Sequence, residues 1–110
     1  MDAPVFRKPR NYFDVGAKPN HVTFDDGQRE RRNLPWQHYA EARWEHENPE
    51  LIEIAIGDWL ISLYGHDLGP LYAAIEEHTL LRVTAHPDWD DDPARWSDTF
   101  VRQIRFMKTS

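Results

Sequence analysis

Cysteine is absent from this 110-residue chain. Disulfide bonds, thiolate catalysis and cysteine-based zinc sites are therefore excluded by composition. Long apolar runs are absent too: none approaches the roughly 18 residues that cross a bilayer. The N-terminal stretch also lacks the apolar core of a secretory signal. We therefore expect a cytoplasmic protein that makes no use of a membrane.

Short catalytic motifs are missing as well. The sequence contains no G-x-x-x-x-G-K-[S/T] phosphate loop, no G-x-G-x-x-G turn and no H-E-x-x-H zinc motif. Its serines do not stand in the glycine pattern of a nucleophile elbow. We therefore expect no cofactor, assign no catalytic residue and favour a protein that is not an enzyme.

What the chain does contain is enough apolar material for one packed core. Hydrophobic residues make up 40% of the sequence and aromatic residues 13%, and a chain of this length is too short for two independent cores. Prolines and basic residues near the N-terminus interrupt regular structure. We therefore predict a flexible N-terminal arm over residues 1–18 and a single α+β domain over residues 19–110.

Alternating apolar residues predict most of the strands. Ile52, Ile54 and Ile56 share one strand face, the pair Gly57-Asp58 supplies a two-residue turn, and residues 59–64 return as the second strand of a hairpin.

Two further strand regions surround this hairpin. The run Asp25-Asp26-Gly27 predicts another hairpin between residues 21–24 and 28–34, with Arg29, Arg31 and Arg32 facing solvent on an edge strand. Residues 35–46 fit a helix or a strand, and we favour the strand. Residues 99–108 alternate as a long final strand in which Arg102 falls on the apolar side, so it must lie at an end or pair with a carboxylate.

One helix is expected over about residues 69–78, because Pro70 suits a first turn and Leu68, Leu71, Tyr72 and Ile75 have helical spacing. The strands on either side of it are expected to run in the same direction, and to form a crossover if they are neighbours. The predicted fold is therefore α+β: a mostly antiparallel sheet of five to seven strands with this helix packed on one face.

The same geometry suggests a site for ligands. His66 and Asp67 follow the strand before the helix, and His86 and Asp88 follow the strand after it, so both pairs are expected at one sheet edge. Two imidazoles and two carboxylates suit a divalent metal ion or acid/base chemistry. These residue types are also ordinary in loops, and no closely spaced histidine pair is present. The four residues are therefore candidate metal ligands only.

Charge is distributed unevenly along the chain. Of the net charge of −6, residues 1–45 contribute +1, residues 46–98 contribute −10 and residues 99–110 contribute +3. Nucleic acids are bound by clustered Lys and Arg, so we expect no direct nucleic-acid binding through the acidic face.

An acidic, tryptophan-containing stretch closes the middle segment. We predict that it binds a partner, because Trp is enriched in interface hot spots; the alternative is that its indoles cover the edge of the core. The predicted partner-binding residues are Trp89, Asp90, Asp91, Asp92 and Trp96.

The leading functional hypothesis is a small non-enzymatic protein-interaction module that binds a protein partner or associates with itself. An acidic inhibitor that mimics nucleic acid, as some phage-encoded anti-defence proteins do, is one alternative. A small metal-dependent or acid/base enzyme that uses His66 and His86 is the other. The chain has the general look of short bacterial proteins, and no residue role is carried over from any family.

Overall fold

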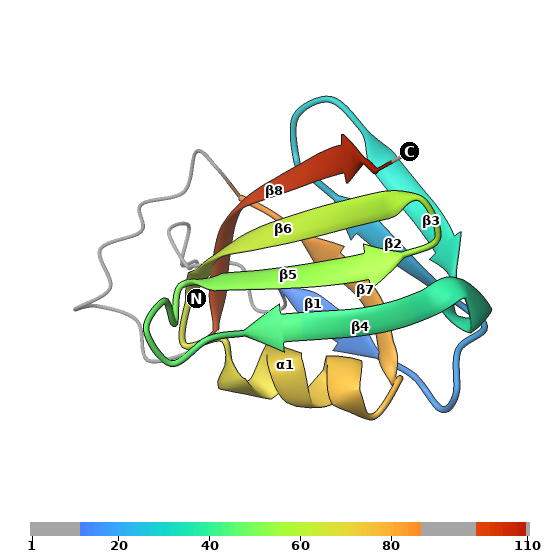
Figure 1. Cartoon of the computed structure of the whole chain (residues 1–110), viewed down its shortest axis with the longest axis horizontal. Coiled ribbons are helices and arrows are strands. Elements are labelled where there is room, and N and C mark those ends of the chain that lie inside the picture. Colours follow the sequence, from blue (N-terminus) through green and yellow to red (C-terminus); the bar gives the residue numbers. More distant parts are fainter. Residues whose placement is uncertain (1–11, 87–98, 110) are drawn as a thin grey trace, which may run out of the picture.

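The structure is a computed structural model that describes residues 12–86 and 99–109. This part of the chain contains eight strands and one α-helix, which are labelled in Figure 1. The elements are β1 (Phe13–Val15), β2 (His21–Asp25), β3 (Arg31–Pro35), the short 3₁₀ helix η1 (Trp36–His38), β4 (Tyr39–Trp44), β5 (Leu51–Ile56), β6 (Trp59–His66), α1 (Gly69–Glu76), β7 (Leu80–Thr84) and β8 (Phe100–Lys108).

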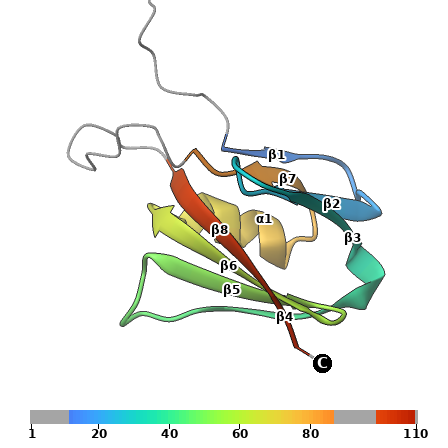
Figure 2. The same ribbon diagram turned by 90° about the horizontal axis from the view of Figure 1, so that it is seen from above.

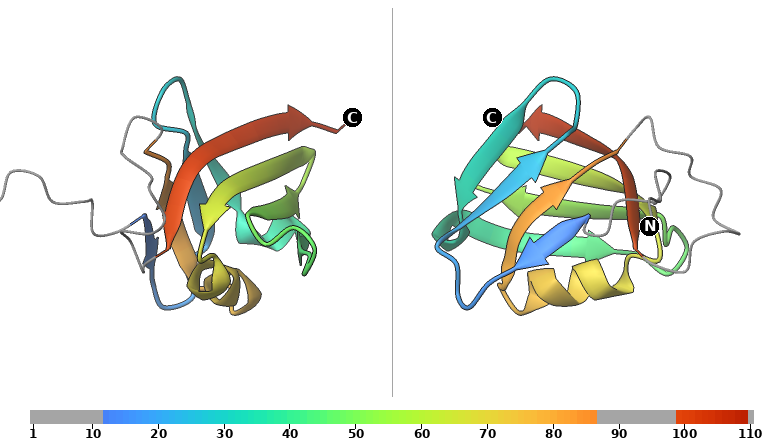
Figure 3. Two further views of the ribbon diagram at one scale, coloured as in Figure 1. Left: turned by 90° about the vertical axis from the view of Figure 1, so that its left-hand side faces the viewer. Right: turned by 180° about the vertical axis from the view of Figure 1, so that it is seen from behind.

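The described strands form two four-stranded sheets. Sheet A has the order β1-β7-β2-β3, and sheet B has the order β4-β5-β6-β8. All three pairs of neighbouring strands in sheet B are antiparallel, whereas in sheet A β2 and β7 run parallel. Figure 2 shows the sheets as two facing layers with α1 between them, and the right panel of Figure 3 shows sheet A in front of sheet B.

The α+β class is confirmed, but the single sheet of five to seven strands is corrected to two sheets of four strands each. One sheet covered by one short helix would leave much of an apolar sheet face exposed. The face of sheet A that carries Val22, Phe24 and Val83 instead packs over the isoleucine face of sheet B, so that each sheet buries the other.

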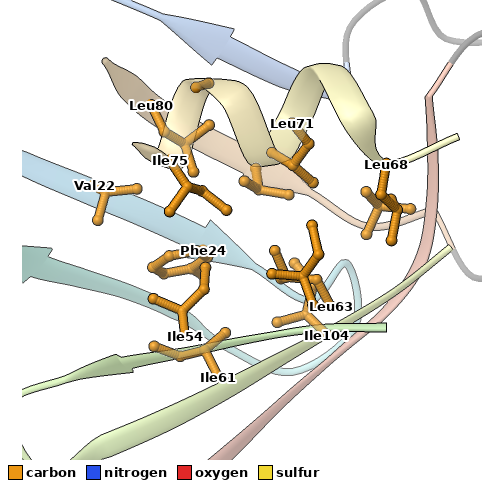
Figure 4. Close-up of a cluster of buried hydrophobic side chains, with 14 of the residues drawn as sticks. Val22, Phe24, Ile54, Ile61, Leu63, Leu68, Leu71, Ile75, Leu80 and Ile104 are labelled. Carbon is orange, nitrogen blue, oxygen red and sulfur yellow. The ribbon is translucent and has the colours of Figure 1, made fainter. Parts of the chain in front are cut away.

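The core is one continuous cluster between the sheets and the helix. Ile52, Ile54 and Ile56 are at most 1% exposed, and Leu71 and Ile75 of α1 are fully buried in the same cluster. Figure 4 shows the helix side chains above and the side chains of sheet B below, with Phe24 between them. Each such side chain contributes roughly 1.5–3 kcal/mol by leaving water.

The hairpin of β5 and β6 has the predicted turn. Ile56 pairs with Trp59, and Gly57 adopts a φ of +60° whereas Asp58 does not have a positive φ. Positive φ at the first position alone is the backbone geometry of a type II′ turn, which glycine adopts without strain.

Helix α1 joins the two sheets rather than covering one of them. Strand β6 before it belongs to sheet B and strand β7 after it belongs to sheet A, so the two are not neighbours and make no crossover within a sheet. The parallel neighbour of β7 is β2.

The N-terminal boundary differs from the expectation. The arm predicted over residues 1–18 does not extend through residues 12–15, because Tyr12 is 3% exposed and β1 pairs with β7 at the edge of sheet A. The strand is only three residues long, with Phe13 and Val15 on either side of Asp14, and nearby prolines obscure this short alternation in the sequence.

Arg32 also differs from the expectation of a solvent-facing edge. It pairs with Phe24 and so lies on the inner face of sheet A. Its guanidinium carbon is 3.7 Å from the centre of the Trp59 ring, and its Nε is 2.7 Å from Glu30 Oε2. Cation–π contact and an ion pair allow the charge to lie between the two sheets.

The other local predictions agree with the structure. Residues 39–44 form the strand that we favoured, preceded by the 3₁₀ turn η1, and the final strand covers residues 100–108. Arg102 is the extra residue where the register with β6 shifts, which takes its side chain away from the apolar side, and it lies 4.0 Å from Glu50. No helix in residues 12–86 and 99–109 is long and apolar enough to cross a membrane.

Candidate interaction surface

The predicted partner-binding residues Trp89, Asp90, Asp91, Asp92 and Trp96 lie outside the described residues, as does the candidate metal ligand Asp88. Their role stays a prediction. The other three metal-ligand candidates are described, and the structure places two of them in one aromatic cluster.

His66 and His86 meet around Phe100, the first residue of β8. His66 pairs with Phe100 across the strands, and their rings are stacked with centroids 5.2 Å apart. Tyr12 contacts Phe100 and His86 edge-on, with centroid distances of 5.1 and 4.8 Å. His66 at the end of β6 therefore enters this cluster through Phe100, and His86, which follows β7 of the other sheet, enters it through Tyr12.

The polar atoms of this cluster are poorly solvated. The Tyr12 hydroxyl and His66 Nε2 are buried and form no hydrogen bond with any described residue. Burial raises the pKa of Tyr12 to about 12. Burial also lowers the pKa of His86, against the opposing effect of Asp25. Tyr12 is therefore protonated and His86 uncharged at neutral pH.

Asp67 does not join the two histidines in a metal site. Asp67 is exposed and has a φ of +54°. Its backbone carbonyl accepts a hydrogen bond from Thr99 Oγ1 at 2.7 Å. Within the described ranges, no three His, Cys, Asp or Glu side chains are grouped as ligands of one metal ion. His66 and His86 therefore belong to one aromatic cluster, but no described residue joins them as a third metal ligand.

The outer face of sheet A has a depression, but polar side chains around it are already hydrogen-bonded to one another. A shallow depression of about 440 Å³ is lined by residues of β2, β3 and β7, among them Thr23, Asn33 and Arg82. Asn33 Nδ2 donates to Thr23 Oγ1 at 2.9 Å, and Arg82 donates to Asp25 at 3.1 Å. These polar groups are already paired with each other, which argues against a ligand that would have to displace those bonds.

The outer face of sheet B has a different character. Strand register places Ala55, Leu60 and Met107 in one row across β5, β6 and β8. Met107 is 60% exposed, and the other two are half-buried. Leu51 and Tyr64 form a second half-buried pair on the same face. These side chains point away from the core, since the alternate residues of the same strands fill it.

A row of charge lies between these apolar residues. Arg43, Glu53, Ser62 and Arg105 stand next to one another across β4, β5, β6 and β8, and Arg43 is paired with Glu53 at 3.2 Å. The face therefore combines exposed apolar contacts with a cation at each end. Sequence parity already put Ser62 and Tyr64 on one side of their strand and Arg105 and Met107 on one side of theirs. It could not show that the two strands are neighbours.

Comparison of the chain with protein-family models, with curated proteins and with solved structures finds no significant match. The assignment of function therefore depends on the residues and the geometry described above.

Proposed function

We propose that the chain is a small non-enzymatic protein-interaction module whose partner contacts the outer face of sheet B. The observation that carries the proposal is the row Ala55–Leu60–Met107, an apolar strip on the outer face beside an open edge of the described sheet. Exposed and half-buried apolar side chains that lie in register on one face favour association with another surface. The acidic segment with Trp89 and Trp96 is a second contact region in the same proposal.

The composition of this face suits a protein partner. Met adapts its shape to different apolar surfaces, and Tyr supplies both a ring and a hydroxyl at an interface. Met107 and Tyr64 are the examples here, at residues that the core does not use. Arg105 and the Arg43–Glu53 pair give the face polar contacts around the apolar row.

The test is affinity capture with the tagged full chain from extracts of the cells that produce it. The sheet B variant is Leu60→Glu/Met107→Glu, which changes only outward-facing side chains. The matched control is Thr23→Glu/Leu81→Glu on sheet A, where Leu81 is 43% exposed. Circular dichroism and thermal melting first establish that both variants fold.

We expect proteins that the wild type and the sheet A control retain and that the sheet B variant loses. Light scattering on the purified chain checks for self-association by the same face. The proposal is overturned if the purified chain is monomeric and if the wild type, the sheet A control and the sheet B variant all retain the same proteins.

A further inference from the structure

Strand β8 is the longest open edge of the described sheets. The two sheets end in β1, β3, β4 and β8, which have three, five, six and nine residues. Natural edges are protected by shortness, proline, bulges or charge. β1 is short, β3 ends in Pro35, and β4 begins with a register shift between Tyr39 and Glu41. β8 has charge along its length, and its register with β6 shifts only near its start, beside Tyr64 and Gly65; Figure 1 shows it bordering sheet B.

Within residues 12–86 and 99–109, the backbone groups of β8 on that border have no partner strand. The N–H of Thr109 donates to the Asp58 carbonyl at 2.7 Å, so this residue faces β6 and the turn before it. Backbone groups of an antiparallel strand alternate in direction. Lys108, Phe106 and Ile104 therefore point their N–H and C=O groups away from β6. The register with β6 is regular from Gln103 to Lys108, so no bulge interrupts this part of the border.

The charge on this strand has one sign. β8 carries Arg102, Arg105 and Lys108 and no carboxylate. Of these three cations, only Arg102 has an ion-pair partner within the described part of the chain, Glu50 at 4.0 Å. Antiparallel pairing of two β8 strands would gather the cations of both copies along one seam with no counter-charge, which opposes dimerisation through this edge. The same charges attract a strand that carries carboxylates.

We propose that β8 accepts an extended acidic segment of another protein as a fifth strand of sheet B. Its backbone would pair with the outward N–H and C=O groups of Ile104, Phe106 and Lys108. Its carboxylates would lie on the outer face beside Arg105, and the side chains between them would face the core side of the sheet beside Ile104 and Phe106. The inference rests on the proposed function and names the chemical class of the partner. It extends the outer-face contact to the adjoining edge.

The probe is a capped nine-residue peptide of alternating Val and Glu, titrated into the full chain and followed by backbone NMR. We expect shift changes concentrated on residues 103–108, and binding that weakens as salt is added. A peptide of alternating Val and Lys tests whether binding requires negative charge on the peptide. Two further Val/Glu peptides, N-methylated on one edge or the other, test backbone pairing. We expect one of them to bind about tenfold or more weakly, because N-methylation removes several hydrogen bonds.

A matched pair of variants tests whether the peptide binds at the β8 edge or elsewhere on the outer face of sheet B. Arg43 and Arg105 stand in the same outer-face row, on the two opposite edges of sheet B. Arg105→Glu should weaken Val/Glu binding about tenfold, whereas Arg43→Glu should leave it within about twofold. Melting curves of both variants verify that neither loses the fold.

Three results would overturn strand addition: no binding of the Val/Glu peptide at millimolar concentration, equal binding of both N-methylated peptides and the parent, or dimerisation of the free chain through β8. If the capture experiment still shows a partner that depends on Leu60 and Met107, the proposed function stands without this mode of binding. If capture shows no such partner while the peptide binds β8 as described, the edge is a peptide site and the outer-face proposal fails.

Discussion

Gly65 passes so close to the backbone of Phe100 that no side chain fits between them. A Cβ at Gly65 would overlap the Phe100 carbonyl oxygen and lie 2.8 Å from the carbonyl carbon and 3.0 Å from Val101 Cα. The contact lies at the register shift between Tyr64 and Gly65, where β6 meets the start of β8. This approach positions Phe100 against His66 and Tyr12, and hence builds the aromatic cluster.

Gly65→Ala should destabilise the protein by about 1–3 kcal/mol or more, because the obstructing atoms belong to backbone and cannot rotate away. Urea denaturation measures the free energy of unfolding. Gly16→Ala is the matched control, since its Cβ would meet only Leu81 Cδ2 at an ordinary 3.8 Å, and we expect a change within about 0.5 kcal/mol. Equal stability of the two variants would contradict the close approach.

Trp36→Phe should cost about 1–3 kcal/mol of stability, because it leaves a buried acceptor without its donor. The Trp36 indole N–H donates to the Leu80 carbonyl at 3.0 Å and so ties η1 to β7. Trp44→Phe removes a similar bond to the Pro49 carbonyl, at 2.9 Å, that lies in an exposed position. Water can replace that donor, so the cost there should be smaller. If chemical denaturation ranks the two variants the other way, the Trp36 bond does not anchor the sheets.

His86 should make the fold sensitive to mild acid. Burial lowers its pKa below the ordinary 6.5, although Asp25 opposes the shift. The folded state therefore takes up a proton at lower pH than the unfolded chain does, and the unfolded state gains protons first as the pH falls. The stabilising contribution is complete above pH 6.5 and is lost as the pH drops from there towards the lowered pKa.

The measurement for His86 is thermal melting at constant ionic strength between about pH 7 and pH 5, the range in which histidine titrates. We expect the Tm of the wild type to fall across this range, and that of His86→Gln to fall less. His21→Gln, at an exposed position, controls for loss of any histidine. Parallel Tm curves for the wild type and His86→Gln would show that His86 is not the responsive group.

Local features of the fold were predictable because they depend on neighbouring residues. The alternation of Ile52, Ile54 and Ile56 defines a strand with one buried face, and Gly57 provides the positive φ that a tight turn requires. The spacing of Leu71 and Ile75 likewise identified the buried side of the helix. Each of these inferences uses a repeat within a few residues.

The candidate site was less predictable, because it depends on which strands are neighbours. Leu60 and Met107 lie side by side only because β6 pairs with β8 across a long interval of sequence. The sequence predicted Arg32 to be a surface cation, whereas the structure places it beside Trp59 of the other sheet. The convergence of His66 and His86 was expected, but from a crossover within one sheet rather than from the start of β8.

Side-chain periodicity and backbone preference act locally, so the amino-acid sequence predicted most of the strands, the tight turns and the apolar faces of this protein. The division of these strands into two facing sheets, and the open border formed by β8 in the described part of the chain, emerged only from the three-dimensional fold. The reason is that burial of apolar faces is non-directional: the isoleucine face can be covered by a helix or by a second sheet, and the complete chain selects the arrangement that buries both.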